Sequence, residues 1–219
     1  MSLRIPSWWP RPRQHVPPQS APTAPLEETW APPHDTYRCR VHEAGHALLL
    51  PFHPQGLHPQ AVVHPGDDLF SPHVETGYLQ LGPCSVFELL FDMHMALAGR
   101  AAERLLLHDV SDGSLQDILT WESLARRYLS TTDDDHVLPF IHAPTTPAEA
   151  CHNATVLRDL RRVQDGIVTD FLRSNRGSLE HVAFLLLEEG PLYGAALQDQ
   201  LLGVQPTFSL SESLRDRDA

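Results

Sequence analysis

The amino-acid sequence predicts a mainly α-helical fold with a small β-sheet. Long stretches with apolar residues at helical spacing follow two capping-box sequences, which begin at Ser85 and Thr146. Only two short runs, residues 61–63 and 75–81, have strand character. Prolines gather at the N-terminus, where nine of the 20 stand within residues 1–33. Regular structure is therefore expected only after this segment.

Composition divides the 219 residues into three parts. Residues 1–34 form a proline-rich arm that cannot build a core and is expected to be disordered or draped over the domain. Residues 35–203 suffice for one domain with a core of its own. Residues 204–219, rich in Ser, Arg and Asp, are predicted to be a polar C-terminal tail.

The first helix is expected to begin at Asp35 as its N-cap and to end near Pro51. The His-Pro steps and glycines that follow predict a loop around the short strand at 61–63. The second strand, 75–81, ends at a Gly-Pro pair, and the two strands could form a pair with each other.

Helices account for most of the remaining chain. The box at Ser85 opens a helix to about residue 107, and another is expected over 114–129. An acidic and proline-rich loop follows, and Thr146 with Pro147 then opens a helix that reaches about residue 174. Two shorter helices, 179–189 and 195–202, each end at a glycine.

The first helix carries the string His42-Glu43-Ala44-Gly45-His46. Positions i and i+4 share one face of a helix, so the two histidines can present their imidazoles to one divalent metal ion, with Glu43 beside it. A zinc ion with two such ligands and a third activates water, and the glutamate can take its proton. Because 14 residues are His, the motif alone does not decide the function.

Charge and cysteine content exclude several classes of protein. The net charge of −12 argues against nucleic acid as a partner, since phosphate binding requires a basic surface. Cys39, Cys84 and Cys151 are an odd number without CxxC spacing, which favours a reducing cytoplasm over a disulfide framework. No secretory signal and no stretch of about 18 apolar residues is present, so a soluble, cytoplasmic protein without a membrane anchor is expected.

Four blocks, in order, resemble the peptidase domain of the FtsH family, the M41 zinc metallopeptidases. They are residues 41–48 around the histidine motif, 77–81, 96–103 and 113–118. A weaker fifth block begins at Phe171, and the resemblance extends over about residues 35–203. It implies an FtsH-like helical architecture built around a zincin-type HExxH helix, with Zn²⁺ as the cofactor.

The resemblance also implies a third metal ligand, an aspartate near the start of a helix, and Asp117 is the residue that matches. It stands 71 positions after His46, so only the fold can bring the two together. Alternatively, Asp117 caps its own helix in a box with Ser114. Glu103 is a reserve ligand, although an ion pair with Arg100 or Arg104 is the simpler role for it.

Residues Gly77, Tyr78, Leu79 and Gln80 resemble the edge strand that lies along the active-site cleft of this family. An exposed edge can bind an extended substrate through main-chain hydrogen bonds, which would give broad specificity. An ordinary strand, in which Tyr78 and Leu79 simply pack, is the alternative.

Several other residues could add to the site. Cys39 can border the metal, although a small buried side chain is its commoner role. His94 is expected to hydrogen-bond within the core rather than to face the cleft. The loop histidines, which an accessory metal could use but solvent more often surrounds, are His53, His58, His64 and His73.

The sequence thus predicts an ATP-independent zinc metalloendopeptidase. Glu43 is the expected general base, His42, His46 and Asp117 are the expected ligands, and peptides or unfolded protein segments are the expected substrates. No GxxxxGK[ST] loop and no Lys occurs, so we expect a stand-alone domain without the family's AAA ATPase module, for which a homo-oligomer is one of the assemblies left open. Two alternatives remain, a metal-binding regulatory or scaffold protein and a metal-free helical domain used for assembly.

Overall fold

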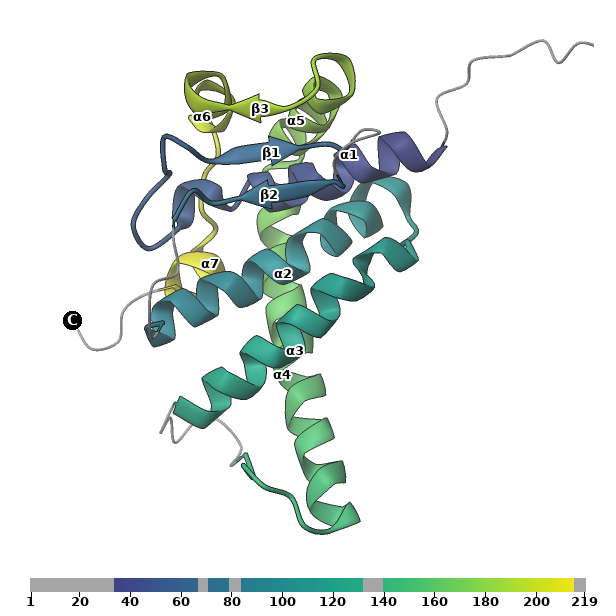
Figure 1. Ribbon diagram of the computed structural model, residues 1–219, viewed down its shortest axis with the longest axis vertical. Coiled ribbons are helices and arrows are strands. Elements are labelled where there is room, and N and C mark those ends of the chain that lie inside the picture. Colours follow the sequence, from purple (N-terminus) through teal and green to yellow (C-terminus); the bar gives the residue numbers. More distant parts are fainter. Residues whose placement is uncertain (1–33, 67–70, 79–83, 132–139, 215–219) are drawn as a thin grey trace, which may run out of the picture. The chain divides into compact units, whose positions relative to one another are not determined.

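The computed structural model describes residues 34–66, 71–78, 84–131 and 140–214, and side chains from Thr36 onward. The predicted mainly helical fold with a small sheet is confirmed (Figure 1). Apart from its last residue, His34, the predicted arm 1–34 lies outside the described residues. The elements are α1 (His34–Ala47), a 3-10 turn η1 (Leu50–Phe52), β1 (Val62–His64), β2 (His73–Glu75), α2 (Val86–Leu107), η2 (Asp112–Ser114), α3 (Leu115–Thr131), α4 (Pro147–Ser174), α5 (Arg176–Glu188), β3 (Leu192–Tyr193), α6 (Gly194–Leu201) and α7 (Phe208–Ser213).

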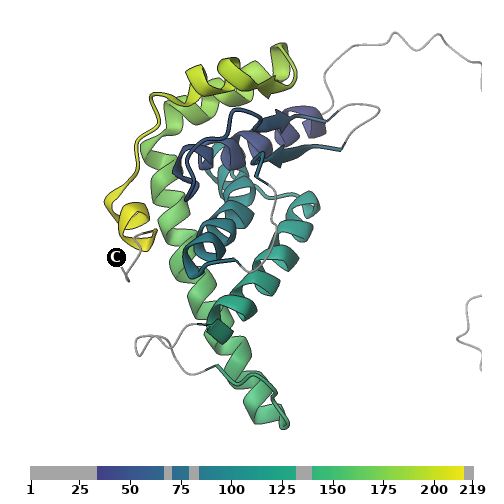
Figure 2. The same cartoon turned by 60° about the vertical axis from the view of Figure 1, so that its left-hand side comes forward.

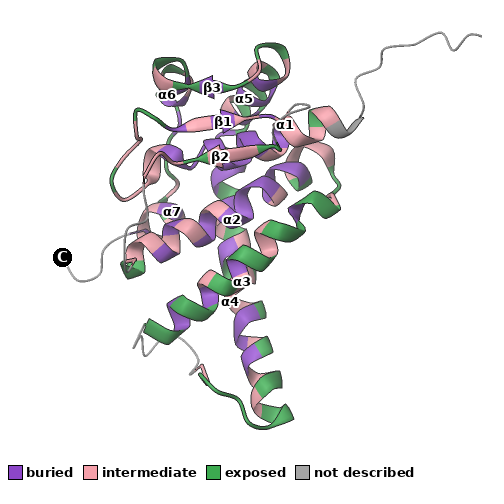
Figure 3. Cartoon of the chain, viewed as in Figure 1, coloured by how far each residue is buried: buried purple, intermediate pink, exposed green. Residues whose placement is uncertain are grey.

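The motif helix α1 lies between the sheet and α2 (Figure 1). It packs against α2 and α5, and the sheet lies beside it (Figure 1). Gly45 allows the close approach to α2, because a Cβ at this position would lie 2.6 Å from Ala98 O and 2.7 Å from Ala102 Cβ. The facing sides of α1 and α2 are buried (Figure 3). The histidines are thus held by a packed helix pair.

Both predicted capping boxes are formed. The backbone N–H of Glu88 donates to Ser85 Oγ at 3.1 Å, and Ser85 N–H donates back to the Glu88 carboxylate at 2.8 Å. Thr146 and Glu149 repeat the pattern, with distances of 3.2 and 3.0 Å. These local hydrogen bonds satisfy N–H groups that have no partner within the helix, which explains why both helices start where predicted.

A strand pair is present in this region, but its second strand is β2, which shares only Glu75 with the predicted strand 75–81. The sheet has the antiparallel order β2-β1-β3, with Val63 opposite both Val74 and Leu192. β2 ends at Glu75, and Gly77, with φ of +81°, turns the chain away from the sheet. Leu79 and Gln80 lie outside the described residues.

The prediction of a polar tail over 204–219 is wrong for residues up to 214. Val204, Leu210 and Leu214 are buried, and α7 lies beside the long helix α4 (Figure 2). Thr207 caps α7 by accepting a hydrogen bond from Leu210 N–H. Three apolar side chains among many polar ones are therefore enough to bury this segment against the helices.

The core role expected for His94 is confirmed. Its ring is fully buried, and Nδ1 lies 2.6 Å from the carbonyl oxygen of Leu90. The other nitrogen, Nε2, lies 3.2 Å from Ser213 Oγ and so joins α2 to α7. Burial lowers the pKa of His94 to about 4, so this ring is neutral and belongs to the packing of the C-terminal helix.

Candidate metal centre

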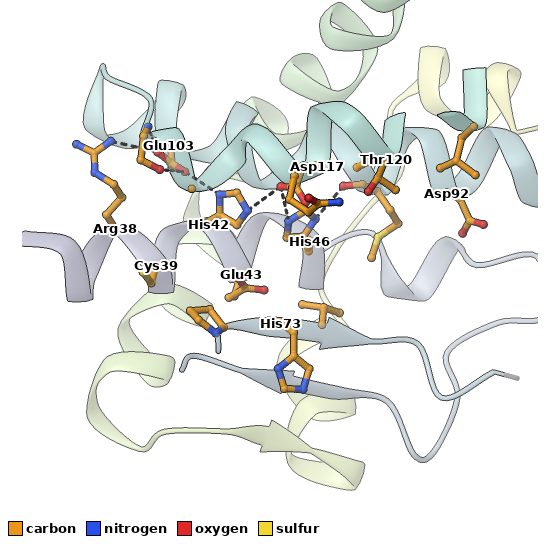
Figure 4. Close-up of a pocket in the computed structure, with 18 residues that line it drawn as sticks. Arg38, Cys39, His42, Glu43, His46, His73, Asp92, Glu103, Asp117 and Thr120 are labelled. Atoms are coloured by element: carbon orange, nitrogen blue, oxygen red, sulfur yellow. Dashed lines mark hydrogen bonds and ion pairs between the residues drawn. The ribbon is translucent and has the colours of Figure 1, made fainter. Parts of the chain in front are cut away.

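Three side chains from two helices meet at one point (Figure 4). Asp117 Oδ2 of α3 lies 2.8 Å from His42 Nε2 and 3.4 Å from His46 Nε2 of α1. One ligand atom from each residue lies within 4.8 Å of the others. Tetrahedral zinc with bonds of about 2.0–2.1 Å needs neighbouring ligand atoms about 3.3 Å apart. The two distances from Asp117 are close to this value. The three predicted ligands are therefore brought together.

The two histidine rings are oriented by contacts of their Nδ1 atoms, the nitrogens that do not face Asp117. His46 Nδ1 lies 2.8 Å from Met95 O, an acceptor only, so Nδ1 carries the hydrogen. His42 Nδ1 lies 2.7 Å from Glu103 Oε1. Both Nε2 atoms are thereby turned toward Asp117, and such partners fix the tautomer that a metal requires. Asp117 Oδ2 is buried and has no well-aligned hydrogen bond, as expected of a metal ligand.

Glu103 contacts the His42 ring at Nδ1, the nitrogen that does not face Asp117. Its side chain is buried, contacts Arg38 at 3.1 Å, and accepts hydrogen bonds from Ser111 N–H at 2.7 Å and Ser111 Oγ at 3.1 Å. Burial alone would raise the pKa of Glu103, but hydrogen bonds from His42, Ser111 and Arg38 lower it to about 2. Its ion pair is with Arg38, which the sequence did not suggest, rather than with Arg100 or Arg104.

The capping alternative for Asp117 is not supported. Ser114 Oγ donates to Ser111 O at 2.9 Å and accepts from Arg100 at 3.3 Å, so its hydroxyl is already engaged. The Asp117 carboxylate points to the histidines (Figure 4). Burial opposes ionisation of this group, but contacts with His42 and His46 hold the pKa of Asp117 below its usual range.

Glu43 follows the first histidine and lies on the side of α1 that faces the strands (Figure 4). It is 5 % exposed and lines a cavity of about 690 Å³ that also contains both histidines and Asp117. Burial raises the pKa of Glu43, and the charges of His46 and His42 oppose that shift. A buried carboxylate with a raised pKa beside a metal group suits a general base.

The wall of this cavity opposite α2 and α3 is β2, not the segment that the sequence indicated. Val74 and His73 line the cavity, and β2 is an edge of the sheet. Tyr78 lies elsewhere, because its hydroxyl donates to Gln55 O at 2.8 Å and its ring stacks on His53 at 4.3 Å. Neither Gly77 nor Tyr78 is among the residues that line the cavity.

The other residues considered for the site, Cys39 and the loop histidines, differ in whether they line the cavity. Cys39 lines the cavity one helical turn before His42. His64 and His73 stack across the β1–β2 pair with ring centroids 5.4 Å apart. Within the described part of the chain, no group of three ligands other than His42, His46 and Asp117 is close enough to hold a metal ion. The loop histidines therefore gain no support as an accessory metal site.

Because Gly99 of α2 has no side chain, the His42 ring can lie directly against it. A Cβ at this position would overlap Nε2 of that ring and lie 2.6 Å from two of its carbons. Gly99→Ala is therefore expected to displace His42 and weaken zinc binding by about 10–100-fold, as a misplaced ligand does, while helix content is retained because Ala favours helices. Gly166→Ala in α4, where the new Cβ meets nothing within 4 Å, is the control. Equal zinc affinity of the two variants in chelator competition would contradict this prediction.

A second prediction concerns pH. Burial would lower the pKa of His42, but contacts with Asp117 and Glu103 raise it to about 10 in the metal-free protein. Zinc must therefore displace a proton, and its apparent affinity should rise about tenfold per pH unit between about pH 6.5 and 9. The His42 contribution to the stability of the metal-free form is fully present below about pH 6.5 and is lost as pH rises through about 10. Chelator competition across this range tests the first effect, and an unchanged affinity would contradict it.

An HExxH helix whose histidines meet a carboxylate from a second helix is a zincin-type arrangement, which defines a metallopeptidase-related domain. Among known proteins, the chain is 30% identical to ATP-dependent zinc metalloprotease FtsH 3 of Symbiobacterium thermophilum over 204 residues, 80% of this chain and 31% of that protein. FtsH 1 of the same organism is 30% identical over 203 residues, with 83% and 32% covered. The FtsH of Paraburkholderia phymatum is 28% identical over 207 residues, with 80% and 30% covered.

About four fifths of this chain is therefore an FtsH-family, peptidase-like region. The chain spans about a third of the length of these relatives. No family model matches it. No helix within the described ranges is both long and apolar enough to cross a membrane.

Proposed function

We propose that this chain is a zinc-dependent peptidase that hydrolyses peptide bonds in peptides and in unfolded or flexible protein segments. The observation that carries the proposal is the position of Glu43, a buried carboxylate in the same cavity as the three ligand side chains. The donor set of two imidazoles and one carboxylate suits zinc. The relatives' names, ATP-dependent zinc metalloprotease, support this choice of metal and reaction.

Each residue has a distinct task in this reaction. His42, His46 and Asp117 would hold Zn²⁺, which supplies a Lewis acid that acidifies water and polarises the scissile carbonyl. Glu43 accepts the proton of the attacking water and then passes it to the leaving amine. Glu103 holds the His42 ring in its productive orientation from behind.

The substrate backbone is proposed to lie along β2, in place of the 77–80 segment. β2 is an edge strand that borders the cavity, so an extended peptide can add to it through main-chain hydrogen bonds. Such bonds do not depend on side chains, which favours broad specificity. The sequence contains no Lys and no phosphate-binding GxxxxGK[ST] loop, and we propose that hydrolysis by these residues needs no ATP.

The test uses the purified chain loaded with zinc, with casein and a random peptide library as substrates. Cleavage that a chelator stops, that added zinc restores and that ATP does not change is the expected result. Bound zinc without cleavage of any substrate would instead favour the regulatory or scaffold role. Failure to bind zinc would favour the metal-free assembly domain.

A further inference from the structure

The edge of β2 that borders the cavity ends, on one side, at a pair of prolines. β1 and β2 pair at three positions, of which His64 opposite His73 is the last. One step further, the same register places Pro65 opposite Pro72. Neither proline has an N–H, so the ladder of hydrogen bonds cannot continue past this point. Arg40 of α1 donates to the carbonyl oxygen of Pro65, which fixes this end of the strand pair to the motif helix.

At its other end, β2 is followed by a turn that leads the chain away from the sheet. Gly77 has φ of +81°, and a Cβ on this residue would lie 2.5 Å from His58 Nδ1. The next residue, Tyr78, stacks on His53 with ring centroids 4.3 Å apart. These contacts hold the segment after β2 against the loop that follows α1. The described edge therefore consists of three residues, His73–Glu75, or about 10 Å of strand.

The two prolines also determine which main-chain groups of β2 face this edge. In an antiparallel ladder, a non-hydrogen-bonded pair of residues lies between two hydrogen-bonded pairs. Since the prolines cannot bond to each other, the last pair of the ladder, His64 and His73, is a hydrogen-bonded one. The neighbouring pair, Val63 and Val74, is then non-hydrogen-bonded. The N–H and C=O of Val74 therefore point away from β1, toward the free edge of the sheet.

This free edge lies beside the proposed catalytic centre. Val74 and Glu43 line the same cavity, and Glu43 is on the side of α1 that faces the strands (Figure 4). An extended peptide added to β2 can place one residue opposite Val74, which then donates one main-chain hydrogen bond and accepts another. Two positions along the strand, Pro72 can accept a hydrogen bond but has no N–H to donate. In the other direction the chain turns away at Gly77.

We propose that the main chain of Val74 anchors the substrate, and that Pro72 and Gly77 limit main-chain binding to about three substrate residues, so that short peptides are cleaved as efficiently as long ones. This inference rests on the proposed peptidase function, since it names the substrates of the same cavity. One main-chain hydrogen bond corresponds to a factor of about 2–10 in binding. Substrate residues beyond this window gain no such bond from β2, so they should not raise kcat/KM.

The first experiment varies the substrate. The cleavage site is located with the random peptide library, and a capped peptide of about ten residues around it is then shortened from both ends. The kcat/KM should stay within about twofold down to a core of about four residues and fall below that length. Methylation of single main-chain nitrogens in the full peptide removes one donor at a time. It should lower kcat/KM about 2–10-fold or more within one window of about three residues and have little effect outside it.

The second experiment varies the edge. Proline is tolerated on an edge strand where its missing N–H faces solvent, so Val74→Pro should fold and lose only the outward donor. Its kcat/KM should lie about 2–10-fold below that of Val74→Ala, which loses the side chain but keeps the N–H. Pro72→Ala restores a donor and should raise kcat/KM for the ten-residue peptide but not for the shortest core. Pro191→Ala, before β3 and not among the residues that line the cavity, is the control and should change neither. Equal rates for the two Val74 variants, or no gain with Pro72→Ala, would contradict the proposal.

Binding of the same methylated peptides to zinc-loaded Glu43→Gln protein, followed by fluorescence anisotropy, separates this inference from the proposed function. If the wild-type protein cleaves peptides but its kcat/KM falls steadily as they are shortened from about ten to five residues, the three-residue window is refuted and the peptidase function stands. If nothing is cleaved but methylation weakens binding within one window of about three residues, the window stands and the peptidase function fails. Losses spread over five or more residues, or no loss at any position, overturn the inference.

Discussion

Glu43→Gln is expected to lower peptide hydrolysis by about 10³-fold, within the range typical for loss of a general base. The amide has nearly the same shape as the carboxylate but cannot accept a proton from water. Glu43 is not one of the three ligand side chains, so the variant should still bind one zinc ion per chain. Kinetics with a cleaved library peptide and elemental analysis of the same preparation measure the two effects together.

Loss of folding should not explain this result. Burial raises the pKa of Glu43, which means that the folded protein disfavours its charge, and a neutral amide removes that penalty. The metal-free variant should therefore unfold at a temperature no lower than the wild-type protein. Glu180→Gln, the same change in an exposed ion pair on α5, is the control and should keep full activity. A zinc-loaded Glu43→Gln protein that retained a tenth or more of the rate would exclude Glu43 as the base.

Local interactions made much of the fold predictable. The capping boxes at Ser85 and Thr146 are hydrogen bonds between residues three apart, so a short stretch of sequence is enough to predict the start of each helix. The sheet was less predictable, because a strand of three residues has almost no periodicity of its own and β2 ends where Gly77 takes a positive φ. The helix α7 was missed because its stability comes from burial of Leu210 and Leu214, which is a property of the tertiary structure.

In the candidate site, too, local relations could be predicted from the sequence, whereas tertiary contacts could not. The i, i+4 spacing of His42 and His46 predicted that they share a helix face, because that relation is local. The contacts of Glu103 with Arg38 and Ser111 join α1, α2 and the turn before α3, and no spacing rule contains them. One signal could have indicated its burial. Glu103 continues the stripe of Asp92, Ala96 and Gly99 on one face of α2, although a buried glutamate on such a face is rare.

Asp117→Ala is expected to weaken zinc binding by more than about 100-fold, because it removes one of only three protein ligands. The helices should persist, since Asp117 is only partly buried and its close contacts are with the two histidines. Circular dichroism tests helix content, and competition with a chromogenic chelator measures the affinity. Asp170→Ala, which breaks an exposed pair with Arg173 on α4, should leave zinc binding unchanged.

Substitution of Glu103, which contacts His42 Nδ1, should weaken zinc binding less than Asp117→Ala does. Glu103→Gln keeps a hydrogen-bond acceptor near His42 Nδ1 but weakens the charge that orients it, and an effect of about 10–100-fold on zinc affinity is typical of such partners. Because Glu103 is buried in an ion pair with Arg38, its substitution can also destabilise the fold. Arg38→Gln then serves as a second variant, which loosens Glu103 without removing it.

The order of these two effects decides which carboxylate completes the metal group. Asp117 faces both Nε2 atoms, whereas Glu103 faces the opposite nitrogen of one ring, and a ring nitrogen that carries hydrogen cannot bind a metal. Asp117→Ala must therefore cost more zinc affinity than Glu103→Gln in folded protein. The reverse order would mean that the His42 ring turns over on metal binding and that Glu103 is the third ligand. In that case Gly99→Ala, which acts on the Nε2 side of the ring, would affect zinc binding much less than expected.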